Sequence, residues 1–254
     1  MAKVISICSQ KGGVAKTSVT IEIAALFKIR GYKVLVIDFD QQCSLTKNVE
    51  GSLAGNTIYS VFHADCTIND AIQHLECFDL IAGSESLSRA GSEFTDDDDI
   101  TLLKEIVNIV KDDYDFIFVD NGPSRNQLLT MTYVAADYVV IPTECDESSM
   151  DGLVTAQNDI NILKNSAHKD SHAKIIGYIL TKHENTNMHN IAMEDLQALA
   201  KKNKDKPFVA KIRKSIKVSE AKTFHEPVVI LNRGLPIADD FINVANEIIK
   251  RVGK

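Results

Sequence analysis

Short hydrophobic segments of β-type residues alternate with helical segments along the whole chain, and this alternation constrains the fold more than any other feature. The pattern is expected of βαβ units that build a mostly parallel sheet. Strands buried on both faces of a sheet need not alternate polar with apolar residues. The sequence therefore predicts an α/β fold with a twisted, mostly parallel sheet and helices on both faces. The predicted strands are Val4–Cys8, Lys33–Phe39, Phe78–Ala82, Asp115–Val119, Tyr138–Pro142, Ile175–Leu180 and, with a weaker pattern, Phe208–Ile212.

Helical segments lie between the predicted strands. Thr17–Arg30 is followed by Gly31, a residue type that often ends a helix. Ile100–Lys111 follows the acidic run Asp96–Asp99, and carboxylates favour the positive amino end of a helix, although a solvated loop without function is the competing interpretation. Ile237–Val252 is predicted to be the last core-packing helix. Its predicted apolar face is Ile242, Ala245, Ile248, Ile249 and Val252.

The composition bounds the class of protein. With 254 residues, 44% hydrophobic and 25% charged, the chain is expected to form one domain over residues 1–254. No run approaches the roughly 18 apolar residues of a membrane span, and no secretory signal is recognisable, so a cytoplasmic protein without a membrane partner is predicted. The cysteines lack metal-ligand or disulfide spacing. They are Cys8, Cys43, Cys66, Cys77 and Cys145.

The segment Val4–Ser18 combines a strand, a glycine-containing turn and a helix that begins near Lys16. Glycines let backbone N–H groups wrap a phosphate, and the start of a helix adds unpaired N–H donors. Lys16 is predicted to reach the β- and γ-phosphates of ATP, and the Thr17 hydroxyl to ligate Mg²⁺. A simple turn without a ligand is the alternative. The predicted nucleotide-binding residues are Lys11, Gly12, Gly13, Val14, Ala15, Lys16, Thr17 and Ser18.

This loop departs from the standard pattern GxxxxGK[ST], because Gln10 and Ala15 replace its two glycines. Lys11 and the residues that follow it, KGGVAKT, instead resemble the deviant Walker A sequence KGGxxKT of the ParA/MinD family. The resemblance implies a three-layer P-loop NTPase fold and a Lys11 that reaches across a dimer to the partner's phosphates. A lysine supplied in trans can stabilise the charge of phosphoryl transfer, so hydrolysis is expected to require dimerisation. The family most often has glycine at position 15, so Ala15 is expected to tighten the loop or alter turnover while nucleotide binding survives.

Three aspartates follow hydrophobic strands. Asp38 and Asp40 share one side of the second strand, with Asp40 at the start of the next loop. Resemblance to the same family implies that Asp40 positions the attacking water and that Asp38 lies nearer the metal. Asp120 ends a hydrophobic strand in the manner of a Walker B site and is predicted to hold Mg²⁺ through water. The loop that begins Asn121-Gly122 is the expected γ-phosphate sensor.

Basic residues gather in one part of an acidic chain. The formal net charge is −7, but residues 201–222 hold nine basic and two acidic residues, a net charge of +7. Within this stretch Ile212–Ala221 is similar to the IPRSxKLSEA segment of ParA proteins, which implies ATP-dependent binding to double-stranded DNA without sequence preference. Affinity rises with each phosphate neutralised, so a dimer is expected to bind better than a monomer. The predicted DNA contacts are Arg213, Lys214, Lys217 and Lys222.

The chain is thus identified as a member of the ParA-type partitioning ATPases, with Lys11, Lys16 and Asp40 as the predicted catalytic residues. The resemblance implies an ATP-bound homodimer on nucleoid DNA, with hydrolysis and release triggered by a ParB-type partner during plasmid or chromosome segregation. Because the first predicted strand begins near Val4, no amino-terminal helix-turn-helix domain is expected.

Four other interpretations of the loop compete with this one. A MinD-like membrane ATPase normally ends in a basic amphipathic helix, which the carboxyl end here does not convincingly supply. A metabolic ligase of the dethiobiotin-synthetase type has no use for Lys11 in trans. A nucleotide-dependent scaffold that does not hydrolyse ATP is suggested only by Ala15. Relatives of nitrogenase reductase are disfavoured by the placement of the cysteines.

Overall fold

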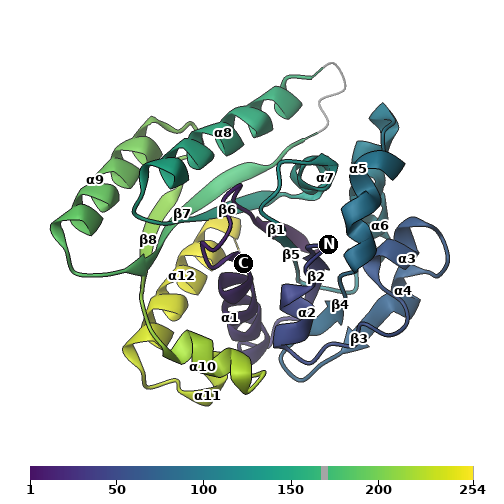
Figure 1. The fold of residues 1–254 in the computed structure, drawn as a ribbon, viewed down its shortest axis with the longest axis horizontal. Helices are drawn as coiled ribbons and strands as arrows, with labels where there is room; N and C mark the ends of the chain where they lie inside the picture. The colour runs from purple at the N-terminus through teal and green to yellow at the C-terminus, as the bar shows by residue number, and fades with distance from the viewer. Residues whose placement is uncertain (167–170, 254) are drawn as a thin grey trace.

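A sheet runs through the centre of the computed structural model, which describes residues 1–166 and 171–253. In the described part of the chain it has eight strands, in the order β3-β4-β2-β5-β1-β6-β7-β8 (Figure 1). Neighbouring strands are parallel except β3 and β4. The strands are β1 (Lys3–Ile7), β2 (Val34–Phe39), β3 (Ile72–His74), β4 (Asp79–Ile81), β5 (Phe116–Asn121), β6 (Tyr138–Thr143), β7 (Lys174–His183) and β8 (Phe208–Arg213).

All seven predicted strands are present, with their ends displaced by no more than three residues. The edge strand β3 was not predicted. It has three residues, two of them the polar Gln73 and His74, which is too short for a hydrophobic period to show. It pairs antiparallel with β4 and so ends the parallel part of the sheet.

Helices cover both faces of the sheet, which confirms the predicted three-layer fold (Figure 1). Along β2, Val34 and Val36 join the hydrophobic cluster under α1 and α12, whereas Leu35 and Ile37 join the cluster under α6 and α7. A third cluster lies under α8 and α9. The helices are α1 (Lys16–Ile29), α2 (Ser44–Asn48), α3 (Ile58–Phe62), α4 (Ile68–Ala71), α5 (Ala90–Glu93), α6 (Leu102–Val110), α7 (Gln127–Ala135), α8 (Glu147–Lys164), α9 (Asn187–Lys202), α10 (Lys217–Thr223), α11 (Val228–Leu231) and α12 (Pro236–Val252), with 3-10 turns η1 (Glu85–Arg89) and η2 (Asp97–Thr101).

Helix α1 is buried along most of its length, from Val19 to Phe27. The ring of Phe27 packs edge-on against Phe116 and Phe118 of β5, with centroids 4.6 and 5.3 Å apart. Full burial of such a side chain stabilises the fold by about 1.5–3 kcal/mol. Gly31, predicted to end the helix, adopts a left-handed φ of 89°. This packing holds the amino end of α1 at the carboxyl end of β1.

The acidic run Asp96–Asp99 forms a helical start rather than an unstructured loop. The predicted helix Ile100–Lys111 is divided, because Asp97–Thr101 is a 3-10 turn and α6 begins at Leu102. The Asp99 carboxylate accepts a hydrogen bond of 3.0 Å from the backbone N–H of Asp96. This contact satisfies a donor that would otherwise be unpaired at the first turn.

Helix α12 packs into the core as the sequence predicts. Ala245 and Ile248 are fully buried against the sheet, and Ile242 and Ile249 are partly buried there. Phe241 and Val244, outside the predicted apolar face, are also buried. The apolar face of this helix is therefore already covered by the protein itself. In residues 1–166 and 171–253, no helix is long and apolar enough to cross a bilayer.

Candidate functional site

The loop between β1 and α1 has the strand–turn–helix form that the sequence predicts. Gly13 has a φ of 82°, in the left-handed region that glycine enters without a steric penalty. Helix α1 begins at Lys16, as predicted, so its first unpaired N–H groups border the loop. Backbone donors and the positive end of a helix dipole thus converge at the carboxyl end of β1. Such a loop is suited to bind phosphate.

Ala15 holds the position before Lys16 in a left-handed conformation, with φ 63° and ψ 26°. A residue with a Cβ atom pays about 1–2 kcal/mol for this conformation. The sequence identified Ala15 as a departure from the family pattern, and the backbone gives the physical reason why glycine is usual there. Ala15 therefore occupies this position at a cost in backbone strain.

The Lys16 side chain is 7% exposed and lies across the loop. Its ammonium donates a hydrogen bond of 3.0 Å to the carbonyl of Lys11. Burial lowers the pKa of Lys16, and the nearby carboxylates of Asp120 and Asp40 offset part of that effect. A buried cation next to backbone N–H groups forms strong charge-assisted hydrogen bonds with phosphate oxygens.

Lys11 forms an ion pair with Asp146 of the same chain. The two side chains are 31% and 37% exposed, so the pair lies at the rim of the loop. Asp146 was not predicted as a site residue. It follows β6, which is a neighbour of β1 in the sheet, and the carboxyl ends of parallel neighbours lie at the same edge. The sequence contained no contact information that would have placed Asp146 next to Lys11.

Thr17 and Asp120 lie together, as the sequence predicts for a metal site. The Thr17 hydroxyl donates a 2.7 Å hydrogen bond to one carboxylate oxygen of Asp120, and Thr20 donates one of 3.1 Å to the other. Asp120 is fully buried. Burial, with a further contribution from the charge of Asp38, raises the pKa of Asp120 to about 8. Asp120 has no ion pair with a described residue, and a buried carboxylate without such a partner is well prepared to receive a cation.

Asp38 lies opposite Asp120 in the register of β2 and β5, but its carboxylate oxygens already accept hydrogen bonds from the protein. One oxygen accepts hydrogen bonds from the backbone N–H and hydroxyl of Thr46, at 2.9 and 2.7 Å, and the other accepts one of 3.3 Å from the N–H of Asp40. Burial raises the pKa of Asp38 to about 6. Asp38 therefore anchors the loop that carries Asp40. Its predicted place beside the metal stays a prediction.

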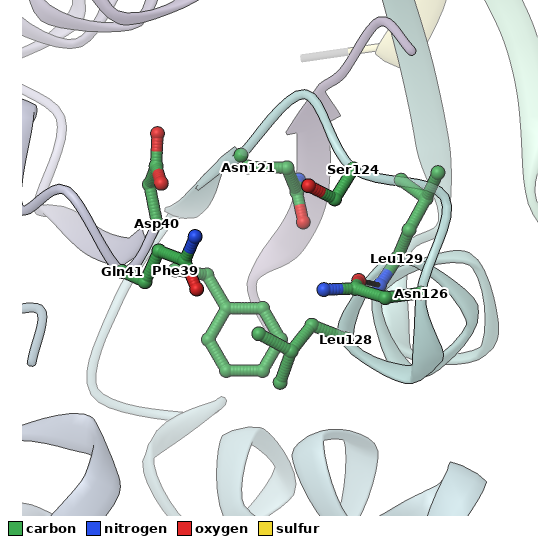
Figure 2. Close-up of a pocket in the computed structure, with 9 residues that line it drawn as sticks. Phe39, Asp40, Gln41, Asn121, Ser124, Asn126, Leu128 and Leu129 are labelled. Carbon is green, nitrogen blue, oxygen red and sulfur yellow. Dashed lines mark hydrogen bonds between the residues drawn. The ribbon is translucent and has the colours of Figure 1, made fainter. Parts of the chain in front are cut away.

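Asp40 lies at the entrance to the loop after β2, where it faces the loop after β5. A Cβ atom added to Gly122 would be 3.0 Å from an oxygen of Asp40, so Gly122 permits a close approach of the two loops. Asp40, Asn121, Gly122 and Ser124 line one pocket, whose apolar side is formed by residues such as Phe39 (Figure 2). The predicted water-positioning carboxylate and the predicted sensor loop are thus neighbours.

Oxygen donors dominate the buried part of the cleft. The Thr17 hydroxyl and the Asp120 carboxylate form the kind of hard donor pair that Mg²⁺ prefers, with the remaining positions left to phosphate and water. In residues 1–166 and 171–253, no group of three or more His, Cys, Asp or Glu side chains has the geometry of a metal site. The donor set therefore fits Mg²⁺ bound together with a phosphate ligand.

Two openings that share lining residues lie over the loop. One, of about 420 Å³, is lined by loop residues including Gly13, Lys16 and Thr17 together with Asp40. The other, of about 550 Å³, extends from Ala15 toward the segment after β8. Lys222, predicted to contact DNA, borders both openings. The first opening has the lining of a triphosphate site, and the second has the volume for the rest of a nucleotide.

The basic stretch 201–222 does not form one surface. Strand β8 (Phe208–Arg213) divides it, because Lys201–Lys206 precede the strand and Lys214–Lys222 follow it. Six strand residues span about 20 Å, so the two groups lie at opposite ends of β8. Only the second group borders the loop that follows β1. A count along the sequence cannot detect this separation.

Three of the four predicted DNA contacts are already paired with carboxylates. Arg213 forms two hydrogen bonds of 2.6 and 2.8 Å with Asp240. Lys214 lies 3.3 Å from Glu184, and Lys217 lies 2.7 Å from Glu220. Lys222 has no ion pair with a described residue.

Comparison with known proteins places these features in a family. The AAA domain family matches residues 2–173. The chromosome-partitioning ATPase Soj of Treponema pallidum is 30% identical over 257 residues, which is 100% of both chains. The sporulation initiation inhibitor protein Soj of Bacillus subtilis is 27% identical and covers 98% of each chain. Both similarities extend beyond the loop to the segment after β8.

A solved structure shares the whole fold. The ATP complex of Cyanothece McdA superimposes with a TM-score of 0.86, covering 97% of this chain and 96% of that one. Its sequence is 21% identical. At that identity the likeness concerns the fold alone.

Proposed function

This chain is a ParA/Soj-type ATPase of the AAA domain family, a P-loop enzyme that hydrolyses ATP, and from that premise we propose a nucleotide-controlled DNA switch. In this proposal two copies close on two Mg²⁺–ATP units, and the dimer binds double-stranded DNA without sequence preference. A ParB-type centromere-binding protein then stimulates hydrolysis and release in the cytoplasm. The similarity to the chromosome-partitioning ATPase Soj of Treponema pallidum supports the proposal.

The observation that carries the proposal is the convergence of Lys16, Thr17, Asp40 and Asp120 on one loop after β1. Lys16 donates hydrogen bonds to the β- and γ-phosphates, replacing its bond to the Lys11 carbonyl. Thr17 and Asp120 would hold Mg²⁺, which would neutralise phosphate charge. Asp40 orients a water molecule whose oxygen bonds to the γ-phosphorus as the bond to the bridging oxygen breaks, so that ADP leaves and a proton of the water passes to the released phosphate.

Lys11 is proposed to exchange partners when two subunits meet. Within one chain its ammonium neutralises Asp146 at the rim of the loop. A partly exposed ion pair contributes little stability, so the phosphates of a neighbouring nucleotide can compete for Lys11. Transfer of Lys11 to the partner's nucleotide supplies positive charge where it develops during phosphoryl transfer. Hydrolysis is then coupled to dimerisation.

The DNA half of the proposal uses the basic residues after β8 at the edge of the nucleotide cleft. Lys214 and Lys217 can release their exposed carboxylates to meet DNA phosphates, and Lys222 needs to release no ion pair with a described residue. Arg213 is the least available, since its guanidinium is held by the nearly buried Asp240. Each contact releases condensed counterions, so two copies bind much more tightly than one.

The test is DNA co-sedimentation with ATP, ADP or no nucleotide. We expect the protein to bind DNA with ATP but not with ADP or without nucleotide. The Lys11→Ala variant should lose this binding, and the double variant Lys214→Ala with Lys222→Ala should bind much more weakly. The matched control is the pair Lys201→Ala and Lys202→Ala, which removes the same charge at the opposite end of β8. Equal binding in all three nucleotide conditions, or equal weakening by both pairs, would contradict the proposal.

A further inference from the structure

Asp159 on α8 joins two loops that line the nucleotide cleft. One of its oxygens accepts a 2.9 Å hydrogen bond from the side-chain amide of Gln10 and a 3.1 Å bond from Nε of Arg125. The other accepts a 2.5 Å bond from Nη2 of Arg125. Gln10 precedes Lys11 in the loop after β1, and Arg125 lies in the loop after β5. One carboxylate therefore links both loops to α8.

The order of the strands explains this meeting point. Strand β1 lies between β5 and β6, and all three are parallel, so their carboxyl ends form adjacent loops. Gln10 follows β1, Arg125 follows β5, and α8 follows β6. The Asp159 side chain is 14% exposed, while Arg125 is 63% exposed. A nearly buried carboxylate with a two-point contact fixes the orientation of a guanidinium better than a surface pair does.

The loop that Arg125 belongs to also faces the reacting groups. Its residues Asn121, Gly122 and Ser124 line the same pocket as Asp40, and Gly122 lies directly against the Asp40 carboxylate. On the other side, the carbonyl of Lys11, next to Gln10, accepts the hydrogen bond from Lys16. A shift of either loop would change the distance between Lys16 and Asp40. Such shifts matter because small displacements of positioned groups cost large factors in rate.

We propose that Asp159 is a positioning residue that holds the loop 121–126 against the loop after β1, so that Asp40 and Lys16 act on the same phosphate. It works through its hydrogen bonds with Arg125 and Gln10. The inference rests on the proposed roles of Asp40 and Lys16, but not on DNA binding or a partner protein. It predicts that the link affects the rate of the chemical step more than the affinity for ATP.

The test is basal ATP turnover without DNA, which separates this inference from the proposed DNA switch. Asp159→Asn keeps the side-chain volume and removes the charge that holds Arg125. We expect kcat to fall about 10-fold while KM for ATP changes by less than about 2-fold. Arg125→Ala, at a largely exposed position that folding tolerates, should reproduce the same split. Asp151→Asn removes an equal charge from an exposed site on α8 and should leave kcat unchanged.

A charge exchange distinguishes positioning from a general loss of packing. In the double variant Arg125→Asp with Asp159→Arg, the ion pair is restored in reverse, and the Gln10 amide can turn to accept from Arg. We expect this variant to recover most of the kcat lost in Asp159→Asn. Wild-type turnover in both Asp159→Asn and Arg125→Ala would overturn the inference. A rise of KM for ATP as large as the fall of kcat in these variants would overturn it as well. A double variant as slow as the single ones would overturn it too.

Discussion

The nucleotide cleft and the basic segment after β8 carry charge in opposite ways. In the cleft, the side chains of Lys16, Asp38, Asp40 and Asp120 are at most 8% exposed, and each makes at least one hydrogen bond within the protein. At the end of β8, Arg213 and the next residue, Lys214, are 48% and 63% exposed and are paired with carboxylates. Buried charges are costly and persist where a ligand uses them, whereas exposed pairs cost and contribute little. The first region is prepared for its ligand, and the second must rearrange to meet one.

The largest effect on kcat is expected from a substitution that removes a charge in the cleft and keeps the size of the side chain. Asp40→Asn keeps an oxygen that can accept the 3.0 Å hydrogen bond from the N–H of Gln42, so the loop should be unchanged. The loss of a carboxylate that orients water should lower kcat by about 10²-fold or more while ATP still binds. Steady-state hydrolysis and nucleotide titration measure the two quantities. Turnover near the wild-type rate would remove Asp40 from the reaction.

A smaller effect is expected from pH, and it is specific to the cleft. At the proposed site, Mg²⁺ displaces a proton from Asp120, because burial raises the pKa of Asp120 to about 8 and that of Asp38 to about 6. The affinity for Mg²⁺ in the presence of nucleotide should therefore rise up to about 10-fold per pH unit from pH 6 to 8 and level off above 8. Calorimetric titration at several pH values measures this slope. Asp120→Asn should remove most of it, and an unchanged slope in that variant would place the metal elsewhere.

The same shift has a consequence for stability without metal. The folded protein binds the Asp120 proton more tightly than the unfolded chain, in which the pKa is close to its usual 3.8. Ionising Asp120 therefore penalises the folded state. The free energy of unfolding should fall as pH rises from about 4 to about 8, with Mg²⁺ and nucleotide reversing the loss.

The basic segment should divide into a structural and an exposed part. Arg213→Ala leaves Asp240, which is 10% exposed, without its guanidinium partner and should lower the free energy of unfolding by about 1–2 kcal/mol. Lys214→Ala breaks an exposed pair and should change it by less than about 0.5 kcal/mol. Urea unfolding compares the two variants. If both variants lost the same free energy of unfolding, the assignment of Arg213 to a structural role and of Lys214 to an exposed one would be wrong. A loss of DNA binding by Arg213→Ala must be corrected for the fraction of unfolded protein.

The smallest effect is expected at Ala15. Ala15→Gly relieves left-handed strain of about 1–2 kcal/mol but makes the unfolded chain more flexible by about 0.4–1 kcal/mol. The net gain in stability should therefore lie between about 0 and about 1.6 kcal/mol, with ATP binding retained. Gly13→Ala is the reciprocal variant, because it adds a Cβ atom at a φ of 82° and should destabilise the loop. A large loss of stability in Ala15→Gly would show that the Ala15 methyl group makes a contact that the backbone argument omits.

The contrast also separates what sequence predicts from what it does not. Seven strands and the positions of Lys16, Thr17 and Asp120 could be predicted because hydrophobic runs and short spacings determine where a strand ends and a helix begins. The pairing of Lys11 with Asp146, and of Gln10 and Arg125 with Asp159, joins residues more than thirty positions apart and depends on the order of strands in the sheet. The charge count over residues 201–222 failed for the same reason. Strand β8 separates the two groups of basic residues, which lie at its opposite ends.

The central claim is that ATP pairs two subunits through Lys11, and the molar mass in solution tests it most directly. Light scattering of Asp40→Asn, in which ATP should persist, is expected to give twice the 28.0 kDa mass of one chain with ATP and Mg²⁺, and a single chain with ADP. Adding Lys11→Ala should return the ATP sample to a single chain, whereas Asp146→Ala should not. An ATP-loaded protein that stays at the mass of one chain, or a Lys11→Ala variant that pairs as readily, would contradict the account.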